Sequence, residues 1–299
     1  MDVSGSVDVT DASAVCAAVI AILQRRYPEA DFSLIEQIYT DFDTLYRGEL
    51  AGFLACDTSY HDSQHVLDVS LAMARLIDGY EESQPRTSQL GEELAVVGMI
   101  VALFHDSGYI RRQGETDIQN GAEYTKIHVS RSARFMAEYL PSIGCEHWVE
   151  LTGKLVHFTG YEFSPDQIEL ESSRQRVVGE LAGTADVIAQ MADTAYLEKC
   201  RDRLYPEFEL GGMTRQQQAD GSETVLYKSA QDLLIKTPAF IKQTIEERLE
   251  GHFHGLYHYV AVHFGGANLY MDALDKNCRY LEQLIEDDPE LLAQPLLRP

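Results

Sequence analysis

The sequence predicts an all-α fold. Several segments place apolar residues at three- and four-residue intervals, which is typical of helices that bury one face. Alternating apolar and polar runs, the pattern of strands, are scarce, with 223–226 as the only short candidate. The chain has 299 residues and a hydrophobic content of 45%, so it can bury a sizeable core.

Three helices are expected from periodicity and end signals. The first covers 65–76, and another covers 130–140, where Pro141 is expected to end it. Thr237-Pro238 resembles an N-cap followed by a proline at the first helical position, which predicts a helix from there past Leu249.

The most apolar helix is expected to begin at Leu90. Ser88 is a plausible N-cap, and Glu92 and Glu93 suit the positive end of a helix. Gly108 is the expected stop. This segment holds the longest apolar run of the chain, which at eleven residues (94–104) is well under the roughly 20 that span a membrane.

The least regular segment is 206–228, which contains Gly211-Gly212, three consecutive glutamines and Gly221. A loop of this length is expected to be a lid or binding loop, or else disordered. No linker rich in proline, glycine or serine divides the chain. We therefore expect one all-α domain over 1–299, with helical extensions at 12–56 and 201–299.

Charge and cysteine content exclude several classes of function. The formal net charge of −24 argues against binding to nucleic acid or to an anionic membrane surface, since both need a basic face. Acidic residues precede the apolar run 14–23, where a signal peptide would carry lysine or arginine. The five cysteines are odd in number and widely spaced. We expect a reduced, cytoplasmic protein without a membrane span, and oligomerisation stays open.

Histidines and aspartates indicate a metal site. His65 is followed by the pair His105-Asp106 at the end of the apolar helix, and Asp186 stands in an apolar context. Imidazole and carboxylate are ligands of divalent metals. An isolated histidine or aspartate is usually a cap or a solvated residue, but an adjacent pair at the end of a buried helix carries a burial cost that metal ligation removes.

These residues resemble a known family. The order H…HD…D is similar to the HD-domain superfamily of metal-dependent phosphohydrolases, and Tyr60-His61-x-x-x-His65-x-x-Asp68-Val69 resembles the opening motif of its cyclic-nucleotide phosphodiesterases. The likeness covers about 57–200, which would be the HD core. In the animal-type enzymes the pair continues as H-D-x-x-H, whereas here the final position is Tyr109.

The resemblance implies two divalent ions, drawn from Fe, Mn, Zn, Mg, Co or Ni. The ligands of the first would be His65, His105, Asp106 and Asp186, and His128 and His157 would complete a dinuclear site in which Asp106 bridges both ions. The alternative for this last pair is that His128 caps the following helix and His157 packs in the core.

The resemblance also implies an activity. Metal ions activate a water for attack on a phosphoester of a nucleotide-like small molecule. Besides Asp106, the catalytic group would be His61, as the general acid for the leaving oxygen; otherwise His61 is a surface residue at the start of a helix. Two alternatives remain: a mixed-valent diiron oxygenase, whose ligands are the same, and a non-catalytic nucleotide-binding module.

Basic residues near these motifs are candidates for holding the phosphate of the substrate. Arg111 and Arg112 follow the HD pair, and Lys154 lies three residues before His157. In an acidic protein, pairing with nearby carboxylates is the competing expectation.

A second histidine group follows near the C-terminus. It comprises His252, His254, His258 and His263. The aromatic residues between them favour a packed helix that lines a core or pocket over a second metal site.

Overall fold

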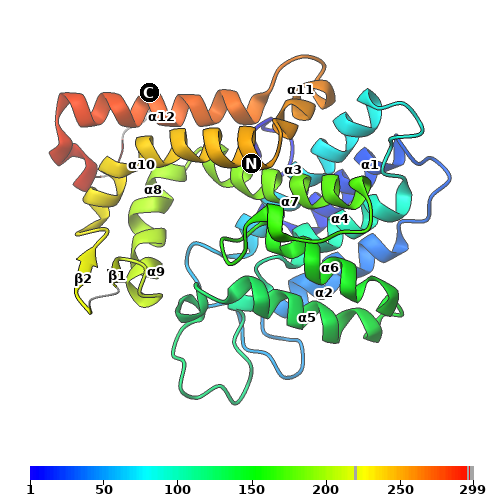
Figure 1. Cartoon of the computed structure of the whole chain (residues 1–299), viewed down its shortest axis with the longest axis horizontal. Coiled ribbons are helices and arrows are strands. Elements are labelled where there is room, and N and C mark those ends of the chain that lie inside the picture. The colour runs from blue at the N-terminus through cyan, green and yellow to red at the C-terminus, as the bar shows by residue number, and fades with distance from the viewer. Residues whose placement is uncertain (219–220, 295, 297–299) are drawn as a thin grey trace.

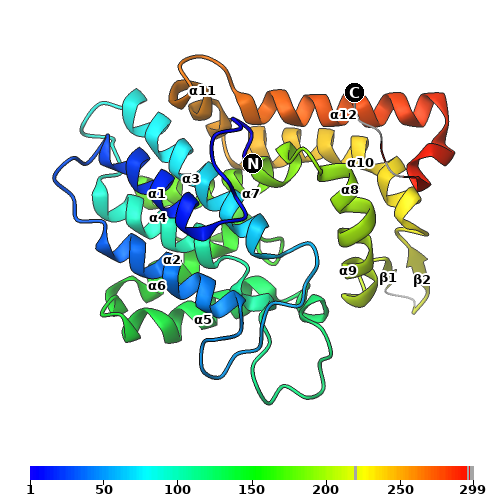
Figure 2. The ribbon, with the colours of Figure 1, turned by 180° about the vertical axis from the view of Figure 1, so that it is seen from behind.

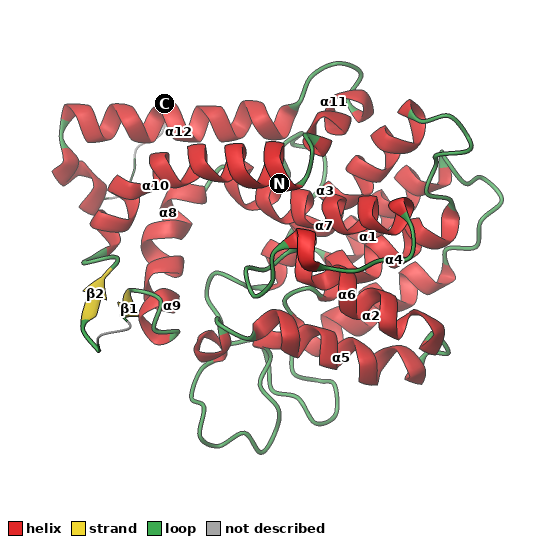
Figure 3. Ribbon diagram, viewed as in Figure 1, coloured by secondary structure: helices red, strands yellow, loops and turns green. Residues whose placement is uncertain are grey.

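The computed structural model describes residues 1–218, 221–294 and 296. The prediction of an all-α fold is confirmed: helices dominate, and the strands of the described chain are β1 (Arg215–Gln217) and β2 (Glu223–Val225), an antiparallel pair (Figure 3). The α-helices are α1 (Ala12–Gln24), α2 (Ser33–Tyr46), α3 (Ser63–Ser83), α4 (Glu92–Phe104), α5 (His128–Ser142), α6 (Val149–Leu155), α7 (Ser173–Ala192), α8 (Tyr196–Lys199), α9 (Tyr205–Leu210), α10 (Ala230–Thr244), α11 (Tyr259–His263) and α12 (Leu269–Asp287).

The centre of the fold is a bundle of α3, α4 and α7, each of which packs against the other two. Helix α4 is apolar on all sides, and every residue from Ala95 to Phe104 is buried. A helix without a polar face must be covered all round, and neighbouring helices cover α4 on several sides (Figures 1 and 2). One connected cluster of buried apolar side chains runs from Val9 to Leu292.

An arm formed by α10 and α12 extends from this bundle to the left of Figure 1. The two helices pack along each other, and α12 also packs on α7. Helix α8 continues through a π-helical segment (Cys200–Leu204) into α9, and this rod and the small sheet lie below the arm in the same view. Among the described residues, no helix is long and apolar enough to cross a membrane.

The start of α4 differs from the prediction. Its N-cap is Gly91, at φ 83°, and the predicted cap Ser88 lies in the preceding loop. Leu90 is buried outside the helix, where its backbone N–H donates to the Glu81 carboxylate at 2.6 Å. The positive φ lets the loop turn into the helix, and glycine adopts it without the cost of a side chain.

Two proline predictions are wrong. Pro141 lies inside α5 rather than ending it, and Pro238 lies inside α10, which begins at Ala230 with Ser229 as its N-cap. The Thr237 hydroxyl caps nothing, because it donates to the Leu233 carbonyl one turn earlier at 2.9 Å. Beyond α10 the chain continues as a π-helical segment (Ile245–His252).

The irregular segment 206–228 contains more order than expected. Its first part belongs to α9, and further on β1 and β2 form an antiparallel pair in which Arg215 lies opposite Val225. The strand expected at 223–226 is confirmed as β2. Residues 219 and 220 of this segment lie outside the described residues.

Candidate metal centre and its cavity

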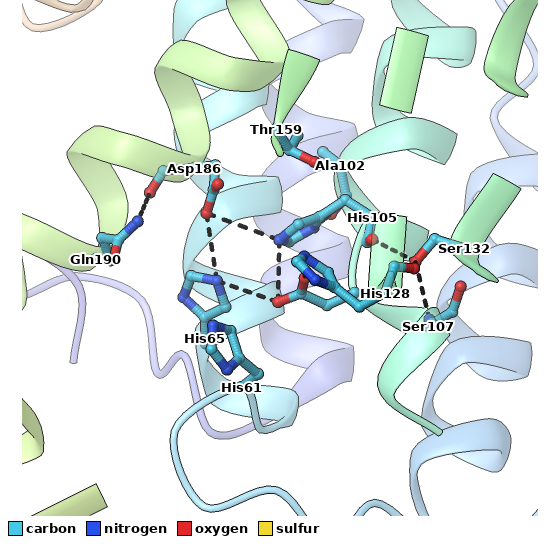
Figure 4. Close-up of polar contacts among 12 residues, drawn as sticks. His61, His65, Ala102, His105, Ser107, His128, Ser132, Thr159, Asp186 and Gln190 are labelled. Carbon is cyan, nitrogen blue, oxygen red and sulfur yellow. Dashed lines mark hydrogen bonds and ion pairs between the residues drawn. The ribbon is translucent and has the colours of Figure 1, made fainter. Parts of the chain in front are cut away.

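Four of the predicted ligands come together from three helices. His65 Nε2 lies 3.5 Å from Asp106 Oδ2 and 3.4 Å from Asp186 Oδ1. His105 Nε2 lies 3.2 Å from Asp106 Oδ2 and 3.7 Å from Asp186 Oδ1. Figure 4 shows His65, His105 and Asp186 pointing toward one another from α3, the end of α4 and α7. His65, His105 and Asp106 form a buried group that can hold a metal ion.

Local backbone structure positions His65 and His105 at the cluster. Asp62, the N-cap of α3, accepts the backbone N–H of His65 at 3.0 Å, which places His65 in the first turn. His105 caps the C-terminus of α4, and its Nδ1–H donates to the Ala102 carbonyl at 2.8 Å. Because that bond fixes the proton on Nδ1, the lone pair of neutral His105 lies on Nε2, facing the cluster.

Two buried atoms of the cluster lack hydrogen-bond partners. His105 Nε2 and Asp106 Oδ2 are 3.2 Å apart, but neither makes a hydrogen bond of acceptable geometry among the described residues. An unpaired polar atom in the core costs about 1–3 kcal/mol. A divalent ion between a neutral imidazole and a carboxylate removes that cost for both atoms. The residues therefore fit a metal ion.

The buried carboxylates set the electrostatics of the cluster. Burial lowers the pKa of His105, but Asp106 and Asp186 raise it, and the net value is about 9. Burial raises the pKa of Asp106 and of Asp186, yet the neighbouring histidines hold both below the ordinary value. A field that stabilises a proton on His105 also stabilises a metal cation, so the two compete for this site.

His128 approaches the cluster from α5. Its Nε2 lies 3.6 Å from Asp106 Oδ1, and its Nδ1–H donates to the Thr125 carbonyl at 2.7 Å. Tyr109 stacks between His128 and His61, with ring centroids 4.4 and 4.5 Å away. Tyr109 occupies the position at which the H-D-x-x-H motif of the animal-type phosphodiesterases has its last histidine. This difference in the motif was the sequence feature that could have drawn attention to Tyr109 as a residue of the site.

Gly108 allows α5 to approach the HD pair. A Cβ at Gly108 would lie 1.9 Å from the His128 carbonyl oxygen, so only glycine fits this contact. Ser132 on α5 strengthens it: its hydroxyl donates to the His105 carbonyl and accepts the backbone N–H of Gly108. The sequence suggested Gly108 as a helix stop, but α4 ends before it and the glycine serves close packing.

His61 lies on the chain just before α3 and lines the same cavity as Asp106. Its Nδ1 lies 2.7 Å from Glu207 Oε2, and the Glu207 side chain also accepts the backbone N–H groups of Tyr60 and His61. Glu207 is 2% exposed and belongs to α9. Burial lowers the pKa of His61, whereas Glu207 raises it, with a net increase. Sequence reasoning missed Glu207, which lies far away along the chain.

His157 packs against an aromatic ring. It lies on a 3₁₀ turn (Val156–Phe158), and its ring packs edge-on against Phe163 with centroids 4.8 Å apart. Its Nδ1 is buried without a hydrogen-bond partner, and within the described chain it forms no ion pair with Asp106. Its role as a ligand of a second ion stays a prediction.

The three basic residues predicted to hold phosphate are engaged elsewhere. Arg111 pairs with Asp57 at 2.6 Å, Arg112 with Glu138 at 2.8 Å, and Lys154 with Glu150 at 2.7 Å. None of the three is part of the cavity lining beside the cluster.

A cavity of about 490 Å³ opens from the cluster toward the C-terminal arm. Asp106, Asp186 and His61 line one end, while α9, α10 and the chain after β2 supply the other. Its two lysines differ: Lys236 donates to Asp232 and to the Leu226 carbonyl, whereas Lys126 is exposed and has no hydrogen-bond or ion-pair partner in the described part of the chain.

The C-terminal histidines do not share a helix face. His254 has φ 51° and is followed by the left-handed Gly255, so His254 and His258 are not on one helix. His263 pairs with the buried Asp78 at 2.7 Å, and His252 lies 3.5 Å from Asp166. Within the described residues, the one metal-type group is that of His65, His105 and Asp106.

Comparisons with known proteins do not identify the chain: no family model matches it, and no curated protein sequence matches it.

Proposed function

We propose that this protein is a metal-dependent phosphoester hydrolase of the HD-domain type, acting as a phosphodiesterase on a small organic molecule. One observation carries the proposal: a buried group that can hold a metal ion lies at the end of a cavity that also exposes the imidazole of His61. A metal site and a proton donor facing one space are what phosphoester hydrolysis requires.

The position of Asp106 supports two ions. Its Oδ2 faces His65 and His105, at 3.5 and 3.2 Å, while its Oδ1 faces His128 at 3.6 Å. In this proposal Asp186 completes the first ligand set, and His128 and His157 belong to the second. When bound, the ions supply an activated water and polarise the phosphoryl oxygens.

His61 supplies the proton for the leaving oxygen. Glu207 holds Nδ1–H, which fixes the ring plane and leaves Nε2 as the nitrogen that faces the cavity. As the water oxygen bonds to phosphorus, the bond from phosphorus to the leaving oxygen breaks, and that oxygen takes the proton from Nε2 of cationic His61. The stacked ring of Tyr109 holds the imidazole from its flat side.

Lys126 is the cation that we assign to the free phosphoryl oxygens. It lines the cavity close in sequence to His128, and it has no carboxylate partner within the described chain. A flexible ammonium at the cavity edge contributes a point charge to an anionic ester. It takes the place of the three residues predicted from the sequence, which are paired away from the cavity.

The test combines elemental analysis of protein purified without chelator with turnover of bis-p-nitrophenyl phosphate in added Mn²⁺. Bound metal together with release of p-nitrophenol would support the hydrolase. Two irons, no cleavage and consumption of dioxygen would favour the diiron oxygenase instead. Nucleotides bound by metal-loaded protein and left intact would favour the non-catalytic binding module.

A further inference from the structure

The far end of the cavity is apolar, in contrast to the end formed by the cluster. Its walls are the side chains of Val187 and Met191 on α7, Phe208 on α9, Leu226 after β2, and Leu233 on α10. A volume of about 490 Å³ is in the range of sites that enclose a whole small molecule. The group that fills this end is in contact mainly with carbon.

Three of the polar side chains that line the cavity are already paired within the protein. The Thr237 hydroxyl donates to the Leu233 carbonyl at 2.9 Å, and the Thr159 hydroxyl donates to the Val156 carbonyl at 2.8 Å. Gln190 accepts the Tyr60 hydroxyl at 3.3 Å and donates to the Asp186 carbonyl at 3.4 Å. The hydroxyl protons of both threonines are therefore occupied, and a nucleobase acceptor beside them would lose hydrogen bonds to water without replacing them, which is costly.

Large apolar side chains also lie at the entrance of the cavity. Tyr161 and Phe240 line the cavity while being 72% and 42% exposed, and Ile127, next to Lys126, is 51% exposed. Large apolar side chains at the edge of a concave site favour an apolar ligand. The only cation there without a partner in the described chain is Lys126, at the end near His128.

We propose that the substrate is an amphiphilic phosphoester, whose phosphoryl group lies at the metal end beside Lys126 and whose alkyl or aryl group fills the apolar end. This substrate class rests on the proposed hydrolase function. It replaces the nucleotide that the family resemblance implies.

The test compares three diesters that share p-nitrophenol as leaving group: methyl, hexyl and thymidine-5′ p-nitrophenyl phosphate. Since the reacting bond is the same, differences in KM report how the second group is bound. Each methylene that is buried contributes about fourfold to binding. We expect the hexyl ester to have a KM at least about tenfold below that of the methyl ester, and the thymidine ester to gain nothing over methyl.

A matched pair of variants locates the effect. Phe240 and Ile235 both lie on α10 and are 42% and 41% exposed, but only Phe240 lines the cavity. Phe240→Asp should remove most of the hexyl preference, measured within the variant as the ratio of the KM values of the methyl and hexyl esters. Ile235→Asp should keep the preference of the wild type. Both positions are exposed enough to accept a carboxylate without unfolding.

A binding measurement separates the two proposals. Calorimetric titration with hexyl phosphate and with thymidine 5′-monophosphate needs no turnover. Tighter binding of hexyl phosphate would support the amphiphilic substrate even if no diester is cleaved. Absence of diester cleavage would overturn only the proposed hydrolase function. Hydrolysis with equal KM values for all three esters, a preference for the thymidine ester, or tighter binding of the nucleotide would each overturn the amphiphilic substrate. A hexyl preference that survives Phe240→Asp and is lost in Ile235→Asp would place the apolar group elsewhere and contradict this cavity assignment.

Discussion

The helices that carry the metal cluster and the C-terminal segment that walls the cavity handle polar groups in opposite ways. In the cluster, His105 Nε2 and Asp106 Oδ2 are buried without hydrogen-bond partners in the described chain. In the wall, polar groups such as the Thr237 hydroxyl and the Lys236 ammonium are bonded within the protein, and carbon faces the cavity. The cluster keeps unused bonding capacity, whereas the wall presents mainly apolar surface.

This difference assigns separate tasks to the two regions. Unsatisfied atoms in the core are maintained at a cost, and a ligand that binds them recovers it. A wall with satisfied polar groups discriminates by volume and apolar area. The regions meet where the buried Glu207 of α9 holds His61. We infer that the cluster determines reactivity and the wall determines which organic group is accepted.

The largest effect is expected for Asp106→Ala. Removing the carboxylate that faces three histidines should eliminate bound metal and lower turnover by about a thousandfold or more, since metal ions supply several kcal/mol of stabilisation in such reactions. Metal content by elemental analysis and p-nitrophenol release measure the two losses. Full metal content in this variant would contradict the role of Asp106.

Asp78→Asn is the matched control for the loss of a buried carboxylate. Asp78 lies on α3 of the same bundle and is 1% exposed, but it pairs with Arg26 at 2.6 Å and with His263 at 2.7 Å. This variant should lose stability and keep its metal. Loss of metal in both variants would mean that general disruption of the bundle, and not the cluster, explains the result.

His61→Ala tests the contact between the two regions. The variant should keep its metal but hydrolyse methyl phenyl phosphate on the order of a hundredfold more slowly, because phenolate needs a proton. Methyl p-nitrophenyl phosphate, with its better leaving group, should be slowed much less. Glu207→Gln should show the same pattern more weakly, and the exposed His147→Ala should show neither effect. Equal slowing of both esters would argue against proton donation by His61.

Gly108→Ala tests whether close packing positions α5. The new Cβ would meet the His128 carbonyl at 1.9 Å, so the helix must shift. We expect a loss of about 2–3 kcal/mol in the free energy of unfolding, measured in urea, and weaker metal binding. Gly153→Ala is the control, since it lies in α6 with open space around it and should be neutral or stabilising. Similar effects at both glycines would rule out the steric explanation.

The cluster was accessible to sequence reasoning because its pattern is local. The HD pair is adjacent in sequence, and His61 and His65 belong to one short motif, so residue type and spacing carry the information. The all-α class follows from helical periodicity in the same way. Ligation itself stays a prediction, since residue identity establishes which atoms are present and not what they bind.

The wall was not accessible, because its residues are related only through tertiary contacts. Glu207 is 146 residues from His61 and lies in a segment whose composition indicated irregular structure. Pro238 breaks the local rule for helix starts inside α10, where packing of the arm prevails over propensity. The choice of Arg111 as a phosphate ligand needed knowledge of Asp57, a carboxylate far away along the chain that pairs with it.

The smallest effect is expected for a substitution in the ion pair of Glu115 and Arg131, which lies outside both regions and whose polar atoms are hydrogen-bonded to each other. Glu115 accepts two bonds from the Arg131 guanidinium, at 3.0 and 3.1 Å, and the backbone N–H of Arg112 at 2.7 Å. Burial raises the pKa of Glu115, but Arg131 and the backbone bond lower it to about 2, from an ordinary 4.5. A carboxyl with a lowered folded-state pKa stabilises the protein above pH 4.5, and this contribution disappears as the pH falls toward 2.

Glu115→Gln should therefore cost about 1–2 kcal/mol at pH 7, since the bidentate pair is partly solvated. The difference between wild type and variant should shrink steadily as urea unfolding is repeated below pH 4.5. Metal content should be unchanged, because the carboxylate of Glu115 is already hydrogen-bonded within the protein and is not available to a metal ion. A difference that is constant with pH would show that the pair acts through packing alone. Loss of metal would instead show that Glu115 contributes to the metal site. It would contradict the assignment of metal binding to the polar atoms that lack hydrogen-bond partners.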